Sequence, residues 1–176
     1  MDRTPKSGEQ SASEPAGSRQ RLLKNRVRSA LVAHGFDSAP IREFTETTAT
    51  AADAAAALGV PVGEIVKSLV FMAGDQPILV LTSGPNRVDV NKVAQLTGQK
   101  IVRANADQVR QATGFAIGGV PPFGFPSPLK TYCDADLLDY AEVWAAAGTP
   151  NSVFPIDPGD LVRISAAEVV DVAVRG

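Results

Sequence analysis

The sequence has few of the residues that build disulfides, zinc sites and imidazole-based catalytic groups. Its 176 residues include one cysteine, Cys133, and one histidine, His34. An intramolecular disulfide is therefore impossible, which suits a reducing cytoplasm. A zinc site would consist almost wholly of carboxylates, so we expect no metal and no cofactor. His34 falls in an early predicted helix, so nucleophilic catalysis based on histidine is not expected, and Cys133 is expected to be a core thiol.

Long apolar runs and a large excess of either charge are also missing. No run approaches the roughly 18 residues of a membrane span, and the N-terminus lacks the apolar core of a signal peptide. We therefore expect a cytoplasmic protein without a membrane partner. Because the formal net charge is -2, any contact with nucleic acid must come from a local group of cations.

Residues 1–17 combine Ser, Pro, Gly and charged residues without an aliphatic core former. Such a segment cannot offset the entropy of ordering, so we predict a disordered tail and a folded domain over residues 18–176. A helix is predicted from Ser18 to about His34, followed by Gly35. Its outward face is basic and is either a solvated surface or a contact for RNA, with Arg19, Arg21, Lys24, Arg26 and Arg28.

Strand-like and helix-like segments alternate irregularly through the rest of the chain. The predicted strands are 39–44, 65–73, 77–82, 100–104, 130–133, 141–147, 151–156 and 168–174. The predicted helices and helical turns are 51–58, 89–96, 134–138, one capped by Asn105 or Asp107 that ends at Ala112, and one that begins at Pro158. This pattern predicts a mixed α/β domain, in which short helices surround a curved, mostly antiparallel mixed sheet.

Residues 114–126, GFAIGGVPPFGFP, mix glycine and proline with large apolar side chains. Glycine permits positive φ and proline removes hydrogen-bond donors, so no regular helix or central strand fits this stretch. The segment is either a rigid turn between two elements or a shaped loop that brings bare backbone N–H groups to a ligand.

Lys67 interrupts the apolar run Ile65–Phe71. Alternation along a strand places it on a face that is otherwise apolar. Leaving its ammonium buried and unpaired would be costly, so Lys67 should find an anion, a carbonyl or a cleft. A solvent-facing lysine at the side of a sheet is the alternative.

The order and spacing of several short motifs resemble the YbaK-like aminoacyl-tRNA editing family, which includes free-standing deacylases and the editing insertion of bacterial prolyl-tRNA synthetases. The resemblance covers about residues 20–175. The motifs that carry it are Leu58-Gly59-Val60, Glu64–Phe71, Val88–Lys92, Thr113-Gly114, Gly118–Gly124, Asp134 and Gly148.

This resemblance implies a hydrolase that cleaves the ester of a small, mischarged amino acid on tRNA, with tRNA-Pro as a candidate. Aminoacyl-tRNA is then the partner, and prolyl-tRNA synthetase a second one. Lys67 matches the functional lysine of the family, and Ser68 the hydroxyl residue beside it. Gly118 and Pro122 match the ends of a Gly-x-x-x-Pro loop associated with the terminal adenosine and the aminoacyl group. In some members a hydroxyl residue precedes the glycine matched by Gly148, whereas here Ala145–Ala147 supplies methyl groups.

Hydrolysis of an activated ester depends more on orientation and oxyanion stabilisation than on a strong nucleophile. We therefore assign catalysis to Lys67, as a point charge, and to the backbone N–H groups of Gly118 and Gly119. The residues expected to contact the substrate are Ser68, Val120, Pro121, Pro122, Phe123, Ala146 and Gly148. A rim of cations is expected to contact tRNA, although each of them can equally be solvated surface: Lys92, Lys100, Arg103 and Lys130.

Two other functions fit the same residues. A non-catalytic module that binds tRNA or a nucleotide and regulates a synthetase would use the same loop and lysine. A purely structural partner-binding domain would need neither of them. Trp144 is expected to pack in the core.

Overall fold

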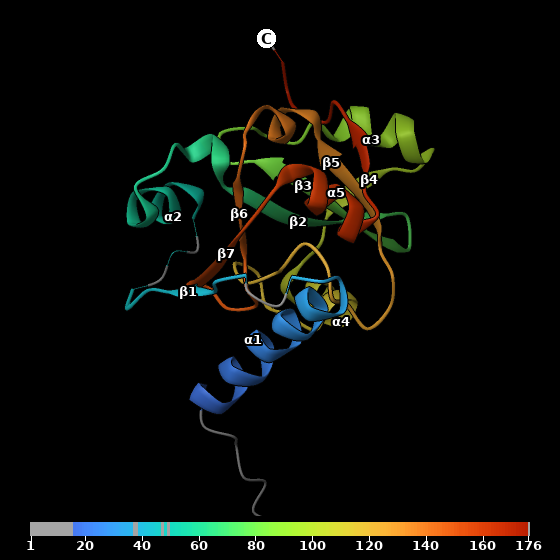
Figure 1. The fold of residues 1–176 in the computed structure, drawn as a ribbon. Helices are drawn as coiled ribbons and strands as arrows, with labels where there is room; N and C mark the ends of the chain where they lie inside the picture. The colour runs from blue at the N-terminus through green and yellow to red at the C-terminus, as the bar shows by residue number, and fades with distance from the viewer. Residues whose placement is uncertain (1–15, 37–38, 47, 49, 176) are drawn as a thin grey trace, which may run out of the picture.

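In the computed structural model, which describes residues 16–36, 39–46, 48 and 50–175, helices surround two β-sheets (Figure 1). The helices of the described part are α1 (Ala16–Ala33), α2 (Ala51–Leu58), α3 (Val90–Thr97), α4 (Ala106–Thr113) and α5 (Pro158–Ser165), with short 3-10 turns η1 (Val62–Glu64) and η2 (Ala135–Asp139). The strands are β1 (Arg42–Glu43), β2 (Val66–Ala73), β3 (Gln76–Ser83), β4 (Ile101–Arg103), β5 (Lys130–Asp134), β6 (Val143–Ala146), β7 (Ser152–Ile156) and β8 (Glu168–Val170).

The larger sheet has the strand order β4-β2-β3-β5-β8, and the smaller one has the order β1-β7-β6. Antiparallel pairs join β4 to β2, β2 to β3, and all strands of the smaller sheet, whereas β3–β5 and β5–β8 are parallel. The predicted mixed α/β class with mostly antiparallel strands is therefore confirmed. The single curved sheet that we expected is two sheets, which meet at a bridge between Ile65 and Trp144.

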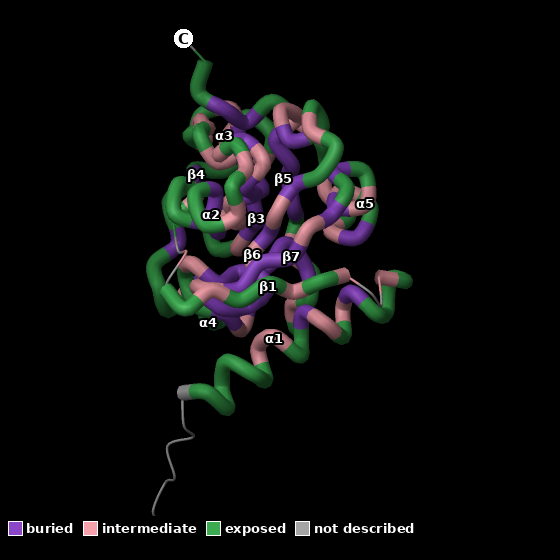
Figure 2. The backbone as a smooth tube through the Cα atoms, turned by 60° about the vertical axis from the view of Figure 1, so that its left-hand side comes forward, coloured by how far each residue is buried: buried purple, intermediate pink, exposed green. Residues whose placement is uncertain are grey.

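Apolar side chains cover both faces of the larger sheet. Val66 and Val70 of β2 face a core shared with α1, α4, α5 and the smaller sheet. Phe71 and its neighbours on the opposite face pack with Val93 of α3. Figure 2 shows the buried residues concentrated in the strands, whereas the N-terminal half of α1 is exposed. Strand β2 and its neighbour β3 therefore lie between two cores, because the two faces of each strand belong to different cores.

The ends of the elements follow local side-chain chemistry. The Asn105 side chain accepts the N–H of Gln108, whose own side chain accepts the N–H of Asn105, so Asn105 rather than Asp107 caps α4. The glycines expected after α2 and α3 do end these helices with positive φ. Helix α1 begins at Ala16, two residues before its predicted start, while residues 1–15 of the proposed tail lie outside the described residues.

Strands β1 and β8 are shortened most relative to the prediction, because pairing covers only part of each predicted segment. In β1 only Arg42 and Glu43 pair with β7, and β8 ends at Val170. Cys133 is fully buried as expected, and burial, together with the charge of Asp134, raises the pKa of its thiol to about 12. None of the described helices has the length and apolar character needed to span a membrane.

Candidate active site

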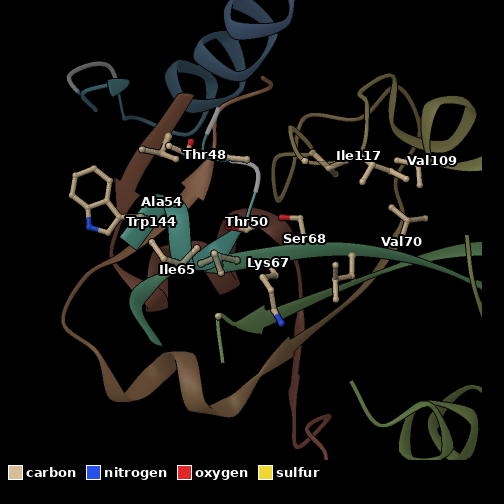
Figure 3. A pocket seen from close by; sticks show the side chains of 18 of the residues that line it. Thr48, Thr50, Ala54, Ile65, Lys67, Ser68, Val70, Val109, Ile117 and Trp144 are labelled. Carbon is tan, nitrogen blue, oxygen red and sulfur yellow. The ribbon is translucent and has the colours of Figure 1, made fainter. Parts of the chain in front are cut away.

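A pocket of about 400 Å³ lies at one edge of β2, between the start of α2, the glycine-rich loop and the smaller sheet (Figure 3). Several of the predicted site residues line it together: Lys67, Ser68, Arg103, Gly118, Val120 and Ala146. The remaining lining residues are mostly apolar: Thr48, Thr50, Ala51, Ala54, Ile65, Val66, Leu69, Val70, Gly84, Ala104, Val109, Ile117, Trp144 and Val153. A half-open apolar pocket with a few polar groups is typical of a small-molecule or cofactor site.

The edge of β2 that borders this pocket is open over three residues. On that side β4 pairs only with Phe71–Ala73, and the N–H of Ala104 donates to the carbonyl of Val70 at 3.1 Å. At the start of β2, Ile65 bridges Trp144. Because backbone groups alternate along a strand, the N–H and C=O of Ser68 point to the same side as the carbonyl of Val70. Within the described part of the chain no strand pairs with Lys67–Leu69 on that side, so these groups of Ser68 face the pocket.

The ammonium of Lys67 donates a 2.5 Å hydrogen bond to the main-chain carbonyl of Asn86. The side chains of Lys67 and Ser68 leave β2 in opposite directions (Figure 3), as their alternation requires. Burial lowers the pKa of Lys67 and the nearby charge of Arg103 lowers it further, whereas Asp134 raises it. We predicted that Lys67 finds a carbonyl or a cleft, and it has both. Its amino group donates to the Asn86 carbonyl, and the residue lines the pocket.

A buried carboxylate supports the loop that holds Lys67. Asp134 is fully buried and accepts hydrogen bonds from the Ser83 N–H at 3.2 Å, the Asn86 side chain at 2.7 Å and the Asp136 N–H at 3.0 Å. The Asn86 amide also donates to Asp136 at 2.7 Å, and Arg175 forms two hydrogen bonds with the Asp136 carboxylate. These bonds to Arg175 and Asn86 hold the pKa of Asp136 below its usual range. Arg175, near the C-terminus, is thereby linked through Asp136 to Asn86, the residue that holds Lys67.

Ser68 places its hydroxyl on the pocket side of β2. The Oγ atom is buried and has no hydrogen-bond partner within the described residues. Figure 3 shows it directed toward Thr50 and the loop that carries Ile117. A buried hydroxyl without a partner loses free energy unless a ligand or water bonds to it. Ser68 therefore presents an unused donor and acceptor to the pocket.

The glycine-rich loop approaches the pocket as a tight turn. The N–H of Gly119 donates to the carbonyl of Ala116 at 3.0 Å, which closes a four-residue turn. Gly118 is the third residue of this turn and has a φ of 91°, a backbone conformation that favours glycine. The amide of Gly119, which we expected to face the substrate, is thus used inside the turn. In the described part of the chain the N–H of Gly118 has no such partner. Of the two predicted donors, Gly118 is the one that can serve a ligand.

Close contacts with other segments hold the glycine-rich loop in place. Gly119 lies so close to Thr149 that an added Cβ would be 2.9 Å from the Thr149 Cα, and at Gly148 a Cβ would be 2.9 Å from the Leu23 carbonyl oxygen. Phe123 is buried against Phe154, with ring centroids 5.7 Å apart. These residues, together with the buried Pro121 and Pro122, shape the loop and are absent from the pocket lining.

The four predicted tRNA-binding cations do not lie together. Arg103 is exposed and lines the pocket. Lys92 pairs with Asp171 at 2.9 Å near the C-terminus, and Lys130 pairs with Glu168 at 3.1 Å. Lys100 precedes β4, and its carbonyl accepts the N–H of Gly74 at the β2–β3 turn. Lys100 thus lies at the end of the β2–β3 hairpin that is far from Lys67. Position thus favours Arg103 among the four.

Trp144 is half-buried and lines the pocket, which corrects the expectation that it only packs in the core. Val153 of β7, which lies opposite Ala146, is also in the pocket wall, and neither Trp144 nor Val153 was predicted as a site residue. Thr48 and Thr50 contribute to the same wall, and the threonine run before α2 was the one sequence signal for that region.

This fold and pocket are those of an aminoacyl-tRNA editing protein. The sequence profile of the family described as "Aminoacyl-tRNA editing domain" matches residues 45–164, and the chain belongs to this YbaK-like family. A solved structure described as a proposed trans-editing enzyme for prolyl tRNA synthetase is 45% identical, with a TM-score of 0.83, over 87% of this chain and 98% of that one.

Curated relatives include a protein that the match covers almost entirely and much longer proteins that it covers in small part. The uncharacterised protein YwhH of Bacillus subtilis is 36% identical over 130 residues, which cover 73% of this chain and 83% of that protein. The proline–tRNA ligase of Leuconostoc mesenteroides is 34% identical over 104 residues, 58% of this chain but 18% of the ligase. The chain thus matches about a fifth of the length of that ligase.

Proposed function

We propose that this chain is a hydrolase that cleaves the ester bond of a mischarged aminoacyl-tRNA and acts in trans, as a protein separate from the synthetase. The observation that carries the proposal is that Lys67, Ser68 and Gly118 line one pocket, where the Gly118 N–H and the Ser68 backbone groups have no hydrogen-bond partner among the described residues. All three can stabilise negative charge on oxygen. His34 contacts Phe123 and is absent from the pocket lining, so the arrangement supplies orientation and charge in place of an imidazole base.

In this mechanism the terminal adenosine and its ester enter the pocket, and water or a substrate group attacks the carbonyl carbon. Negative charge then develops on the carbonyl oxygen, where a preorganised N–H and an ammonium lower the barrier. The bond between the acyl carbon and the ribose oxygen breaks, and the ribose oxygen takes the proton that the attacking group gives up. Attack by water releases the free amino acid, whereas attack by a side-chain group of the amino acid would release it in cyclised form. Lys67 acts in this scheme as a compact charge whose position is set by Asn86.

The pocket wall favours a small amino acid. Of the three alanines at 145–147, Ala146 lines the pocket, while Ala145 and Ala147 are fully buried away from it. Val120 and Val153 complete an apolar wall without a hydroxyl from β6. A space of about 400 Å³ that also accepts part of the terminal nucleoside leaves little room for a large side chain. The relatives named for prolyl-tRNA synthetase and proline–tRNA ligase support tRNA-Pro as the carrier and the synthetase as a partner. A tRNA substrate supports a cytoplasmic location for this activity.

The test is release of amino acid from tRNA-Pro charged with glycine, alanine, serine or cysteine, with enzyme far below the tRNA concentration. Correctly charged prolyl-tRNA is the control. We expect many turnovers with at least one small amino acid and little release of proline. Tight binding of these tRNAs without release would instead support a non-catalytic module that regulates a synthetase.

A further inference from the structure

A cation and two aromatic rings meet beside the pocket, at a place that the proposed chemistry does not use. The guanidinium of Arg42 lies 5.7 Å from the centroid of the Phe44 ring and 5.9 Å from that of Trp144. Arg42 is exposed, whereas both rings are half-buried. We call these three residues the Arg42 cluster.

The register of the smaller sheet places the Arg42 cluster on the pocket side. Arg42 of β1 lies opposite Val153 of β7, and Val153 lies opposite Ala146 of β6. Directly opposed residues of antiparallel strands point to the same face, and both Val153 and Ala146 line the pocket. Trp144, two residues before Ala146, is itself in the pocket wall and is seen at its edge in Figure 3. The cluster is therefore continuous with the pocket rim.

Arg42 has no carboxylate partner among the described residues. Its neighbour Glu43 points to the other face of the strand and pairs with Lys24 of α1. A guanidinium held against aromatic rings keeps its charge available to a phosphate, and its flat face can stack on a planar ligand. Unstacked bases of single-stranded RNA are recognised by this combination of aromatic rings, arginine planes and positive charge.

We propose that the Arg42 cluster binds an unpaired nucleotide of the tRNA 3′ end, by stacking on its base and pairing with its phosphate. The inference rests on the proposed function, because it takes the esterified terminal adenosine to occupy the pocket. The nucleotides before that adenosine are single-stranded and must leave across the rim. The rim at the smaller sheet offers them a stacking surface that Lys92 and Lys100 do not provide, and the ring beside Lys130, that of Tyr132, is buried.

Trp144 is the one tryptophan of the chain, so its fluorescence reports directly on the cluster. The probe is an uncharged RNA minihelix that ends in the unpaired 3′ nucleotides of tRNA. The comparison RNA keeps every phosphate but has abasic sites in place of the unpaired bases that precede the terminal adenosine. We expect the first RNA to quench Trp144 fluorescence and the second to bind about 5- to 100-fold more weakly with little quenching.

Arg42→Ala should weaken binding of the intact minihelix and bring it close to that of the abasic one. In deacylation it should raise KM while kcat stays near the wild-type value. The matched control is Arg163→Ala, since Arg163 also lies 5.7 Å from an aromatic ring, that of Phe36, but is absent from the pocket lining. Arg163→Ala should leave RNA binding unchanged. Both arginines are exposed, so thermal melts should show two folded variants.

Equal binding of intact and abasic RNA, or wild-type binding by a folded Arg42→Ala protein, would overturn the cluster's role. Neither result would affect the proposed hydrolysis, which is measured by amino acid release. Conversely, quenching by uncharged RNA requires no turnover, so the cluster can be confirmed even if no mischarged tRNA is hydrolysed.

Discussion

The Lys67 ammonium and the Asn86 carbonyl, 2.5 Å apart, join the pocket to the buried carboxylate of Asp134. Asn86 offers its main-chain oxygen to the lysine and its side-chain amide to Asp134 and Asp136. Asn86 therefore positions the Lys67 ammonium, and the carboxylates of Asp134 and Asp136 position Asn86.

Replacing Lys67 should separate activity from stability. We expect Lys67→Ala to lower the single-turnover rate of deacylation by about 100-fold or more, since an oxyanion would lose its charged partner. Because the pKa of Lys67 is lowered on folding, its charged form is disfavoured in the native state, and removing it should not reduce the melting temperature. Lys67→Arg should also be slow, because a planar fork does not replace a compact ammonium. A folded Lys67→Ala protein with near-normal turnover would rule out the mechanism.

The pH dependence should reveal which form of Lys67 acts. Its pKa is lowered by burial and by Arg103. If the ammonium stabilises the oxyanion, the enzymatic rate, corrected for hydroxide-driven hydrolysis, should fall as pH rises through that lowered pKa. Arg103→Ala removes a repulsive charge, so the fall should move to higher pH. A rate that rises to a plateau over the same range would identify a neutral lysine acting as a base.

Substitutions at the two glycines of the turn should impair the protein in different ways, one through activity and the other through stability. Gly118→Val places a β-branched residue at a φ of 91° and should abolish most deacylation, whereas Gly118→Asn should retain more activity, since asparagine tolerates positive φ. Gly119→Ala should instead lower the melting temperature, because its Cβ would press on the Thr149 backbone. Single-turnover rates alongside thermal melts distinguish these outcomes. Equal loss of activity in folded Gly118→Asn and Gly118→Val would show that the turn's φ is not what matters.

Binding of tRNA should be sensitive to salt and to Arg103. We expect Arg103→Glu to weaken binding of uncharged tRNA and to flatten its salt dependence, since a cation at the pocket is lost. Lys130→Glu is the matched control, because Lys130 is paired with Glu168 and is absent from the pocket lining. Fluorescence anisotropy at several salt concentrations measures both variants. Equal losses for the two would show that the pocket rim has no special role in binding.

Much of the fold was predictable because its signals are local. The apolar run of β2 and the glycines after α2 and α3 specify those elements wherever they pack. Lys67 was recognisable as a candidate site residue because a cation inside an apolar run needs a partner, and Asn86 supplies one.

The parts that sequence reasoning missed depend on contacts between distant segments. Trp144 enters the pocket wall because β6 reaches β2 at Ile65, and nothing near Trp144 in the sequence signals that meeting. The Arg42 cluster likewise depends on the register of β1 against β7. We expected the Gly119 N–H to be a second donor to a ligand, but it donates to the Ala116 carbonyl within the turn that presents Gly118.

The open edge of β2 has a consequence for self-association. A long exposed edge invites strands from other chains to pair with it. Here the unpaired stretch is limited to Lys67–Leu69, with β4 closing one end and the Ile65–Trp144 bridge closing the other. Strands are most often about 5–6 residues long, so a gap of three residues offers another polypeptide few hydrogen bonds, whereas a small flexible ligand needs only one or two. The protein thus keeps unpaired backbone groups accessible to a ligand in a gap that gives little support to pairing with another chain.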